Sequence, residues 1–267
     1  MHEEIWIAKL FNDHLAGLGN SALNLVGWQS VARPWSNYVA MELLVFLLAV
    51  VFFLWLRARL SVENPGGTQQ VMELLLRNPM SLGVADLLEN NIGHGAMKYL
   101  PGIGSVGLFV LFSNLISVVP GLASPTAEVS VPLGCAIVVF LYYHWSGLKK
   151  QGPLHYGKHF LGPNLALSPL MVIVETFSHL ARLLSLTVRL WVNMMVSELL
   201  YGIFLGLTLA LFIFVERLNA LGYILAPVPL FAPVIFIILH IFVAFVQAFV
   251  FTILPVIYLA GAVSEGH

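Results

Sequence analysis

Charged and polar side chains interrupt one of the most apolar stretches of the sequence. Arg189 lies in the middle of this stretch, and a guanidinium group stays protonated at any biological pH and is costly near the centre of a bilayer. At helical spacing, polar residues three or four apart form one stripe through it: Glu175, Ser178, Arg182, Ser185, Arg189 and Asn193. Because such a stripe is too polar to face lipid, we expect it to face another protein or a water-filled path.

The members of this stripe differ in what they could do. Glu175 and Arg182 are seven residues apart on the same helical face, so they could pair and hold helices together, with Ser185 as a further structural or modulatory residue. Arg189 has no carboxylate within four residues of its own helix. We therefore expect the counter-charge of Arg189 to come from elsewhere.

Two ionisable residues outside the stripe could carry protons. Glu198 lies nine residues beyond Arg189, which turns it to the opposite face of the helix and displaces it by about 13 Å along the axis. His240 titrates near neutrality and shares a helical face with Gln247. Glu198 and His240 could form a proton relay. A lone intramembrane histidine can equally be a structural hydrogen-bond partner, which is our interpretation of His144 and His179.

The composition limits the class of protein. Hydrophobic residues make up 59% of the chain and charged residues 9%, so the chain is expected to be a polytopic membrane protein. A net charge of −1 with scattered basic residues gives no reason to expect a nucleic-acid partner. The single cysteine, Cys135, allows neither an intrachain disulfide nor a cysteine-based metal site.

Several segments are apolar enough to cross a membrane. Three have the length of a single crossing: Tyr38 to Leu56, about Pro101 to Val119, and about Val131 to Leu148. Two later segments are much longer, from Ser168 to Val215 and from about Leu221 to Val263. A continuous helix of the first length would measure roughly 70 Å, about twice the hydrocarbon thickness.

The long segments therefore either turn back or lie inclined. Residues 185–205 contain no proline, one glycine (Gly202) and no polar loop cluster, so we predict one long inclined helix there. In the other segment, Pro227, Pro229 and Pro233 indicate an irregular stretch before a helix from about Ile235 to Ala262. The sequence thus predicts an all-α membrane protein with about five transmembrane helices, the last two long and strongly tilted.

The distribution of basic residues predicts the orientation. Gln69 to Glu89 is amphipathic and too short to cross, which favours a helix at the cytoplasmic interface. By the positive-inside rule, the connections on this side hold Arg57, Arg59, Arg77, Lys98, Lys149, Lys150 and Lys158, whereas the other side holds Lys9, Arg33 and Arg217. We expect residues 1–37 to be an extracytoplasmic N-terminal segment and residues 38–267 to be a single membrane domain with a cytoplasmic C-terminus.

An ordered set of motifs accompanies these residues. The most specific part is Glu175-(x)13-Arg189-Leu-x-x-Asn193-(x)4-Glu198, followed by His240-(x)6-Gln247-Ala-Phe and Tyr258-Leu. Weaker support comes from the runs that begin at Pro65, Ser113 and Pro125. From about Pro65 to Tyr258 the chain resembles subunit a of the F-type ATP synthases, a non-catalytic membrane subunit without an ATP site.

The resemblance implies a function and roles for individual residues. Such a subunit forms two proton half-channels against a rotating c-ring and couples proton flow to ATP synthesis in the bacterial plasma membrane. The resemblance makes Arg189 the essential charge facing the ring, with Asn193 and Gln247 lining the same contact. Glu198, His240 and Glu128 would serve the inlet, and Glu175 and Ser178 the outlet. It implies as partners the c-ring, the peripheral stalk subunit b and the rest of the synthase, and neither a cofactor nor a metal ion.

The sequence departs from the family pattern at four positions near these residues. Val192 and Ser197 stand where the family usually has glycine or another small residue, Glu128 replaces an aspartate, and Ser130 replaces a common asparagine. These departures affect the shape and polarity of the channels rather than the arginine. The coupling ion is set largely by the ring, although Glu198 with His240 suits protons better than Na⁺.

Two alternative functions use the same intramembrane charges. A stand-alone proton-coupled transporter would be expected to contain an internal repeat, but the two long segments are dissimilar. A haem- or quinone-binding respiratory subunit would use His144, His179 or His240 as axial ligands.

Overall fold

The computed structural model describes residues 5–25, 27–78, 81–93, 95–119, 121–161, 168–216 and 227–263. Within those ranges the chain forms helices and connecting turns and contains no β-strand. Five helical segments are long and apolar enough to cross a membrane: Asn37–Ala58, Ala96–Val118, Ser130–Gln151, Ser168–Phe214 and Val234–Val263. The prediction of an all-α membrane protein with five spans is confirmed.

The first three spans are helices of ordinary length. They are α2 (Asn37–Ala58), α5 (Leu100–Leu115, flanked by the short helices η1, Ala96–Tyr99, and η2, Ile116–Val118) and α6 (Ser130–Gln151). Ser36 caps α2 by accepting a hydrogen bond from the backbone N–H of Val39 at 3.4 Å. Gly152 ends α6 with a φ of 79°, a conformation that glycine adopts without strain. The short helix α7 (Pro153–Leu161) then leads toward the long helices.

The last two spans are far longer than a direct crossing requires. Helix α8 (Ser168–Glu216) has 49 residues and α10 (Pro227–Val263) has 37. At 1.5 Å per residue they measure about 74 Å and about 55 Å, against a hydrocarbon thickness of about 30 Å. The unbroken α8 confirms the prediction of one long helix.

The prediction of an irregular stretch over Pro227 to Pro233 is wrong, and residues 221–226 lie outside the described residues. Helix α10 already begins at Pro227. Pro227 and Pro229 fall in the first turn, where backbone N–H groups have no intrahelical partner, so proline costs little there.

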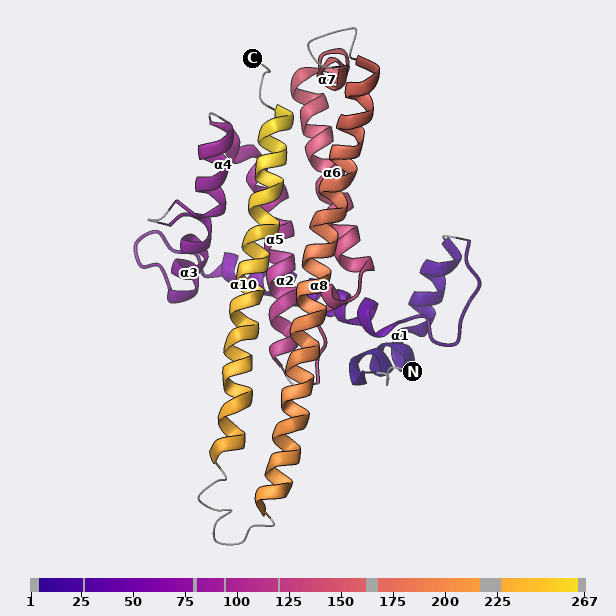
Figure 1. Cartoon of the computed structure of the whole chain (residues 1–267), viewed down its shortest axis with the longest axis vertical. Helices are drawn as coiled ribbons and strands as arrows, with labels where there is room; N and C mark the ends of the chain where they lie inside the picture. Colours follow the sequence, from indigo (N-terminus) through magenta and orange to yellow (C-terminus); the bar gives the residue numbers. More distant parts are fainter. Residues whose placement is uncertain are drawn as a thin grey trace.

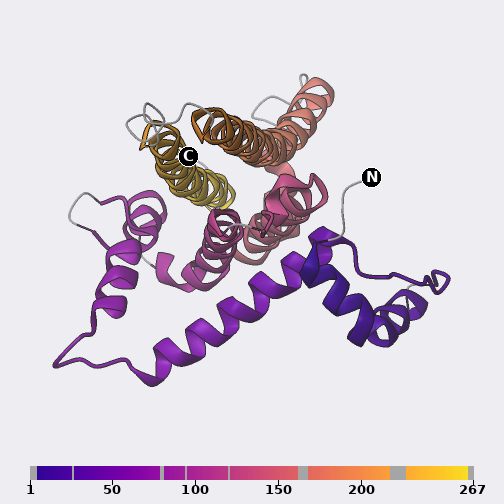
Figure 2. The ribbon, with the colours of Figure 1, turned by 90° about the horizontal axis from the view of Figure 1, so that it is seen from below.

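The helices pack in layers (Figure 1). Helices α8 and α10 run side by side in opposite directions, and α5 and α6 pack against one part of this pair, leaving the end near Glu216 and Pro227 uncovered. Figure 2 shows α2 on the far side of α5 and α6, running crosswise to the pair. With 22 residues α2 measures about 33 Å, close to the membrane thickness. If α2 takes the direct path across the membrane, the α8–α10 pair is strongly inclined.

The main core lies between α5, α6, α8 and α10. One stripe of α8, formed by Leu186, Leu190 and Met194, is at most 2% exposed, and α10 contributes residues such as Phe251 and Leu259. Helices α5 and α10 approach closely, because a Cβ atom added at Gly107 would lie 2.3 Å from Thr252 Oγ1.

The amphipathic segment forms two helices rather than the one predicted. They are α3 (Gly67–Leu76) and α4 (Val84–Ile92). Asn78 precedes a proline in the sequence, which disfavours helix, and its backbone N–H instead donates to Asp86 Oδ2 at 2.9 Å. At Gly83 a Cβ atom would lie 2.3 Å from the backbone oxygen of Leu76. The tight turn between α3 and α4 therefore requires glycine at this position.

The N-terminal segment contains a helix that the sequence analysis did not specify. Helix α1 (Trp6–Leu25) packs against the start of α2 through Ile7, Phe11 and Met41. Asn12 exchanges two hydrogen bonds of 3.0 Å with the backbone of Trp35. The extracytoplasmic location of residues 1–37 stays a prediction.

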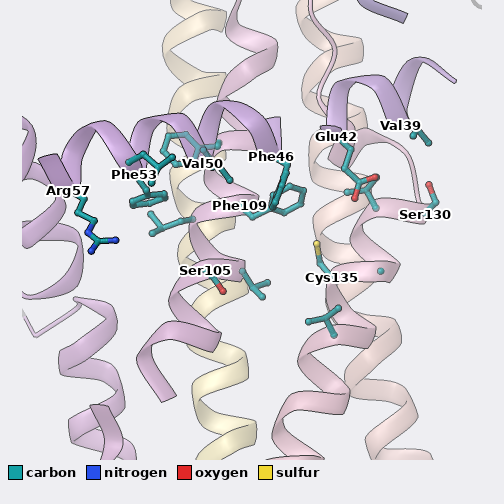
Figure 3. Close-up of a pocket in the computed structure, with 18 residues that line it drawn as sticks. Val39, Glu42, Phe46, Val50, Phe53, Arg57, Ser105, Phe109, Ser130 and Cys135 are labelled. Carbon is teal, nitrogen blue, oxygen red and sulfur yellow. The ribbon is translucent and has the colours of Figure 1, made fainter. Parts of the chain in front are cut away.

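A groove of about 860 Å³ opens between α2, α5 and α6 (Figure 3). Apolar side chains line most of it, four of them phenylalanines, with Arg57 toward one end and Glu42 toward the other. Cys135 of α6 also lines this groove.

Candidate functional site

Arg189 lies on the surface of α8 without a counter-charge. Its side chain is exposed, and its Nη2 donates a long hydrogen bond of 3.4 Å to Ser185 Oγ. Among the residues that the structure describes, Arg189 forms no ion pair. The predicted stripe is present on α8, with the members before residue 183 half-buried and the later ones exposed: Glu175, Ser178, Arg182, Ser185, Arg189 and Asn193.

Asn193 and Gln247 join α8 to α10 beside this stripe. Asn193 Nδ2 donates to Gln247 Oε1 at 2.7 Å. The side chain of Gln247 is 3% exposed, and its Nε2 finds no hydrogen-bond acceptor among the described groups. A buried amide that is only partly satisfied is costly for stability, which is typical of a functional position.

Glu198 faces a buried group of hydroxyl and amide side chains at the end of α5. Its Oε1 accepts a hydrogen bond from the backbone N–H of Ser124 at 2.5 Å. Ser124 Oγ lies 2.6 Å from Thr126 Oγ1, and Thr126 Oγ1 donates to Asn114 Oδ1 at 2.6 Å. Ser124 and Thr126 belong to the turn around η3 (Pro125–Ala127), which packs against α8. We call this group the serine cluster: Ser113, Asn114, Ser117, Ser124 and Thr126, all at most 7% exposed.

His240 reaches the same cluster from α10. It is 5% exposed, its Nε2 lies 2.9 Å from Ser117 Oγ, and its Nδ1 lies 2.6 Å from Ser197 Oγ. The expected relay between Glu198 and His240 is not a direct contact, because no hydrogen bond joins them in the described structure. Neighbouring residues on a helix point about 100° apart, so Ser197 faces His240 while Glu198 faces the turn around Ser124.

Glu128 lies directly after η3 and is half-buried. Tyr38, at the start of α2, is within electrostatic range of both Glu128 and Glu198. The structure therefore brings these two carboxylates to the same side of the helical bundle.

A second polar group surrounds Glu175 at the other end of α6. His179 Nε2 lies 3.3 Å from Glu175 Oε1, and its Nδ1 lies 2.9 Å from Tyr143 OH. The ring of His144 is 4.8 Å from that of His179 between centroids, and its Nδ1 lies 3.0 Å from Tyr156 OH. We call Tyr143, His144, Tyr156, Glu175 and His179 the tyrosine–histidine cluster.

The pairing of Glu175 with Arg182 that the sequence allowed is wrong in the described structure. Glu175 instead pairs with His179, one turn away, and the Arg182 guanidinium lies over the ring of Tyr258 at 5.3 Å. Ser178 is half-buried beside them.

Tyr156 keeps its proton in this setting. Burial raises the pKa of the Tyr156 hydroxyl, an effect that Arg182 opposes and Glu175 reinforces. The neutral phenol can therefore donate to His144 Nδ1. Over the described chain, no group of three or more histidine, cysteine, aspartate or glutamate side chains is placed to hold a metal ion.

Sequence reasoning did not identify several residues that belong to these two sites. They are mainly hydroxyl side chains, namely Ser117, Ser124, Thr126, Tyr143 and Tyr156. The available signal was the small polar residues at the end of the second span and before the third, in the runs that begin at Ser113 and Pro125.

Comparisons with known proteins show the family of this chain. Residues 39–260 match the model of the family described as the ATP synthase A chain. The chain is 43% identical to ATP synthase subunit a of Solibacter usitatus over 97% of this chain and 100% of that protein. It is 40% identical to ATP synthase subunit a of Koribacter versatilis over 100% of both chains, and 40% identical to that of Campylobacter jejuni over 84% of this chain and 89% of that protein.

These relatives give no support to a stand-alone transporter or to a haem- or quinone-binding subunit. The matched region contains all five spans except the ends of the first and last, together with both polar clusters. This multi-pass membrane protein therefore belongs to the ATP synthase A chain family.

Proposed function

We propose that this chain is subunit a of the Fo sector of an F-type ATP synthase, where it couples proton flow to rotation of a c-ring and to ATP synthesis. One observation carries this proposal. Along α8, two separate polar clusters lie on either side of the exposed Arg189. Glu198 is about 13 Å beyond Arg189 along the helix axis, and Glu175 is about 21 Å before it.

In this proposal the serine cluster, with Glu198, His240 and Glu128, forms the inlet half-channel from the outer side. The tyrosine–histidine cluster, with Glu175 and Ser178, forms the outlet half-channel to the cytoplasm. The two clusters lie at opposite ends of α6, as two half-channels that open to opposite membrane faces require.

The basic residues support this assignment of sides. Lys98, Lys149 and Lys150 line one hollow of about 450 Å³ near the end of α6. Lys150 Nζ also donates to the backbone oxygen of Val263 at 2.8 Å, so the end of α10 lies on the same side. By the positive-inside rule this side is cytoplasmic, which favours a cytoplasmic C-terminus and an N-terminus outside. Arg217 and the side chain of Lys158 lie outside the described residues.

The proposed cycle moves one proton at a time. A proton passes Glu198 and His240 and neutralises a ring carboxylate, which can then rotate into lipid; an ionised carboxylate would face a cost of several kcal/mol. After almost a full turn the carboxylic acid releases its proton toward Glu175. Arg189 attracts the ionised carboxylate and repels protons that would otherwise leak between the half-channels.

Other residues have supporting roles in this proposal. Asn193 and Gln247 act at the ring contact beside Arg189: Asn193 is exposed on the stripe, and the buried Gln247 holds its amide through their hydrogen bond. Arg182 and Ser185 are structural or modulatory. Arg182 stacks on Tyr258, and Ser185 is the only described hydrogen-bond partner of Arg189.

Two faces of the described part of the bundle support our assignment of partners. The c-ring lies against the exposed stripe of α8, since no described residue supplies Arg189 with a counter-charge there. We place the peripheral stalk subunit b at the groove between α2, α5 and α6, which is apolar and lies on the side away from the α8–α10 pair (Figures 2 and 3). The bacterial relatives favour a location in the bacterial plasma membrane.

Substitution of Arg189 tests the proposal. In inverted membrane vesicles that contain the complete synthase, Arg189→Ala is expected to abolish ATP-driven acidification and ATP synthesis. Arg189→Lys is expected to be nearly as impaired, because a lysine that the ring covers can lose its proton. Normal coupled synthesis in Arg189→Ala would overturn the proposal.

A further inference from the structure

His240 is held by a hydroxyl group at each ring nitrogen. Ser117 of η2 lies at Nε2 and Ser197 of α8 lies at Nδ1, at 2.9 Å and 2.6 Å. Ser197 stands at one of the positions where this chain departs from the family pattern. The hydroxyl group at this position therefore contacts His240, a residue of the proposed inlet.

The hydrogen bonds of Ser117 determine the tautomer of the neutral imidazole. Ser117 Oγ donates its single proton to the backbone oxygen of Asn114 at 3.0 Å. It can then only accept from His240, so Nε2 carries the imidazole proton. Nδ1 is left with its lone pair, which accepts the proton of Ser197 Oγ. The two serines thus make Nδ1 the proton-accepting nitrogen.

Ser197, the partner of Nδ1, also lines a cavity together with His240. A cavity of about 230 Å³ lies between α8 and α10, and its polar lining is Asn193, Ser197, Tyr201 and His240. From Tyr201 to Asn193 it covers about 12 Å of α8. Its Asn193 end lies one helical turn from Arg189, so it connects His240 with the stripe.

We propose that Ser197 is a positioning residue for proton transfer, which holds His240 with Nδ1 directed to the α8–α10 cavity. This inference rests on the proposed function and assigns a role at its inlet. The protein also offers a neighbouring site for comparison. Thr208 lies eleven residues after Ser197 on the same face of α8 and is 8% exposed, but its hydroxyl donates to the backbone oxygen of Phe204 rather than to an ionisable group.

The transfer step requires only a hydronium ion in the cavity. The Ser197 hydroxyl turns its proton to the carbonyl four residues earlier, as helical serines do. An O–H bond of the hydronium ion breaks and an N–H bond forms at Nδ1, which gives an imidazolium and a water molecule. The new N–H group then donates to Ser197 Oγ, while Nε2–H still donates to Ser117. Both charge states of His240 are therefore fully hydrogen-bonded, and the reverse step returns the proton.

The test compares variants of the complete synthase in inverted vesicles. Ser197→Ala is expected to lower the rate of ATP-driven acidification about five- to tenfold, the effect of losing one hydrogen bond at the transferring group. Ser197→Thr keeps the hydroxyl group and is expected to stay within about twofold of the parent rate, by the same relation. Ser117→Ala is expected to resemble Ser197→Ala, and the matched control Thr208→Val to leave the rate unchanged.

The amount of assembled complex, measured with each rate, separates positioning from folding. A normal rate in Ser197→Ala, an equal loss in Ser197→Thr and Ser197→Ala, or a loss explained by poor assembly would each overturn the role of Ser197. Arg189→Ala, measured in the same vesicles, separates a failure of this inference from a failure of the proposed function. If Arg189→Ala is inactive while Ser197→Ala is normal, only the inference about Ser197 fails, whereas activity in Arg189→Ala contradicts the proposed function itself.

Discussion

At the scale of single residues, the environment of Arg189 differs from that of the other charged groups on α8. Glu175 has His179 beside it, Arg182 has the ring of Tyr258, and Glu198 has the backbone of Ser124. Arg189 is exposed with one long hydrogen bond to Ser185. Among the described residues it has no carboxylate partner, which the proposed ring contact would supply.

Glu198→Gln tests the inlet at this scale. Glutamine keeps an oxygen that can accept from the backbone of Ser124, so we expect normal assembly, but it cannot carry a proton. The rate of ATP-driven acidification in vesicles is expected to fall by about a hundredfold, the usual effect of removing a group that transfers protons. The exposed Glu63, changed to glutamine, is the matched control and is expected to have no effect. An unimpaired Glu198→Gln enzyme would remove Glu198 from the proton path.

The sequence identified the ionisable residues better than their partners. Helical spacing was enough to place Arg189 and Asn193 on one stripe and to turn Glu198 away from it. It could not show that Ser124 binds Glu198 or that Tyr143 binds His179, because these contacts join helices and turns that are far apart in the chain. Serine and tyrosine are also too common for their type alone to indicate a site.

At the scale of elements, the lengths of the apolar segments predicted the five spans. Turn residues were less informative about where the sequence breaks into separate helices. The end of α8 and the start of α6 differ from the predicted boundaries by one residue. The split of the amphipathic segment into α3 and α4 depends on a tight return at Gly83 and on the bond between Asn78 and Asp86. Periodicity does not report such tertiary contacts.

Gly107→Ala tests the close packing of α5 on α10. The added methyl group would lie 2.3 Å from Thr252 Oγ1, so we expect a loss of about 1–3 kcal/mol in stability, measured as a lower melting temperature of the purified complex. Combining it with Thr252→Ala removes that oxygen atom and is expected to restore most of the loss.

Gly104 provides the control on the same helix. A Cβ atom there would lie 3.8 Å from Leu100 Cδ1, an ordinary contact. Gly104→Ala is therefore expected to be neutral or slightly stabilising, because alanine favours helix. Equal effects of the two alanine substitutions would contradict the proposed close approach of α5 and α10.

At the scale of the whole molecule, the orientation in the membrane can be measured directly. In a Cys135→Ala background, Ser30→Cys and Val62→Cys place one thiol on either side of α2, both at exposed positions. A membrane-impermeant maleimide added to intact cells is expected to label Ser30→Cys at once and Val62→Cys only after permeabilisation. The opposite pattern would invert the inlet and outlet assignments.

The bundle as a whole presents two different faces to its surroundings. One is the α8–α10 face, where Arg189 has no ion-pair partner within the described ranges, and the other is the apolar groove between α2, α5 and α6 (Figures 2 and 3). Only the first combines a fixed charge with polar clusters on both sides. In the proposed function the rotating ring therefore contacts the first face.

A disulfide crosslink tests this claim most directly. In the Cys135→Ala background, Ser185→Cys places a thiol one helical turn from Arg189, and Val138→Cys, 55% exposed, places one at the groove. Each is paired with a cysteine introduced beside the carboxylate of the ring subunit and oxidised in vesicles. We predict that Ser185→Cys crosslinks to the ring and stops ATP-driven acidification, whereas Val138→Cys does neither. A crosslink from Val138→Cys with none from Ser185→Cys would contradict the account.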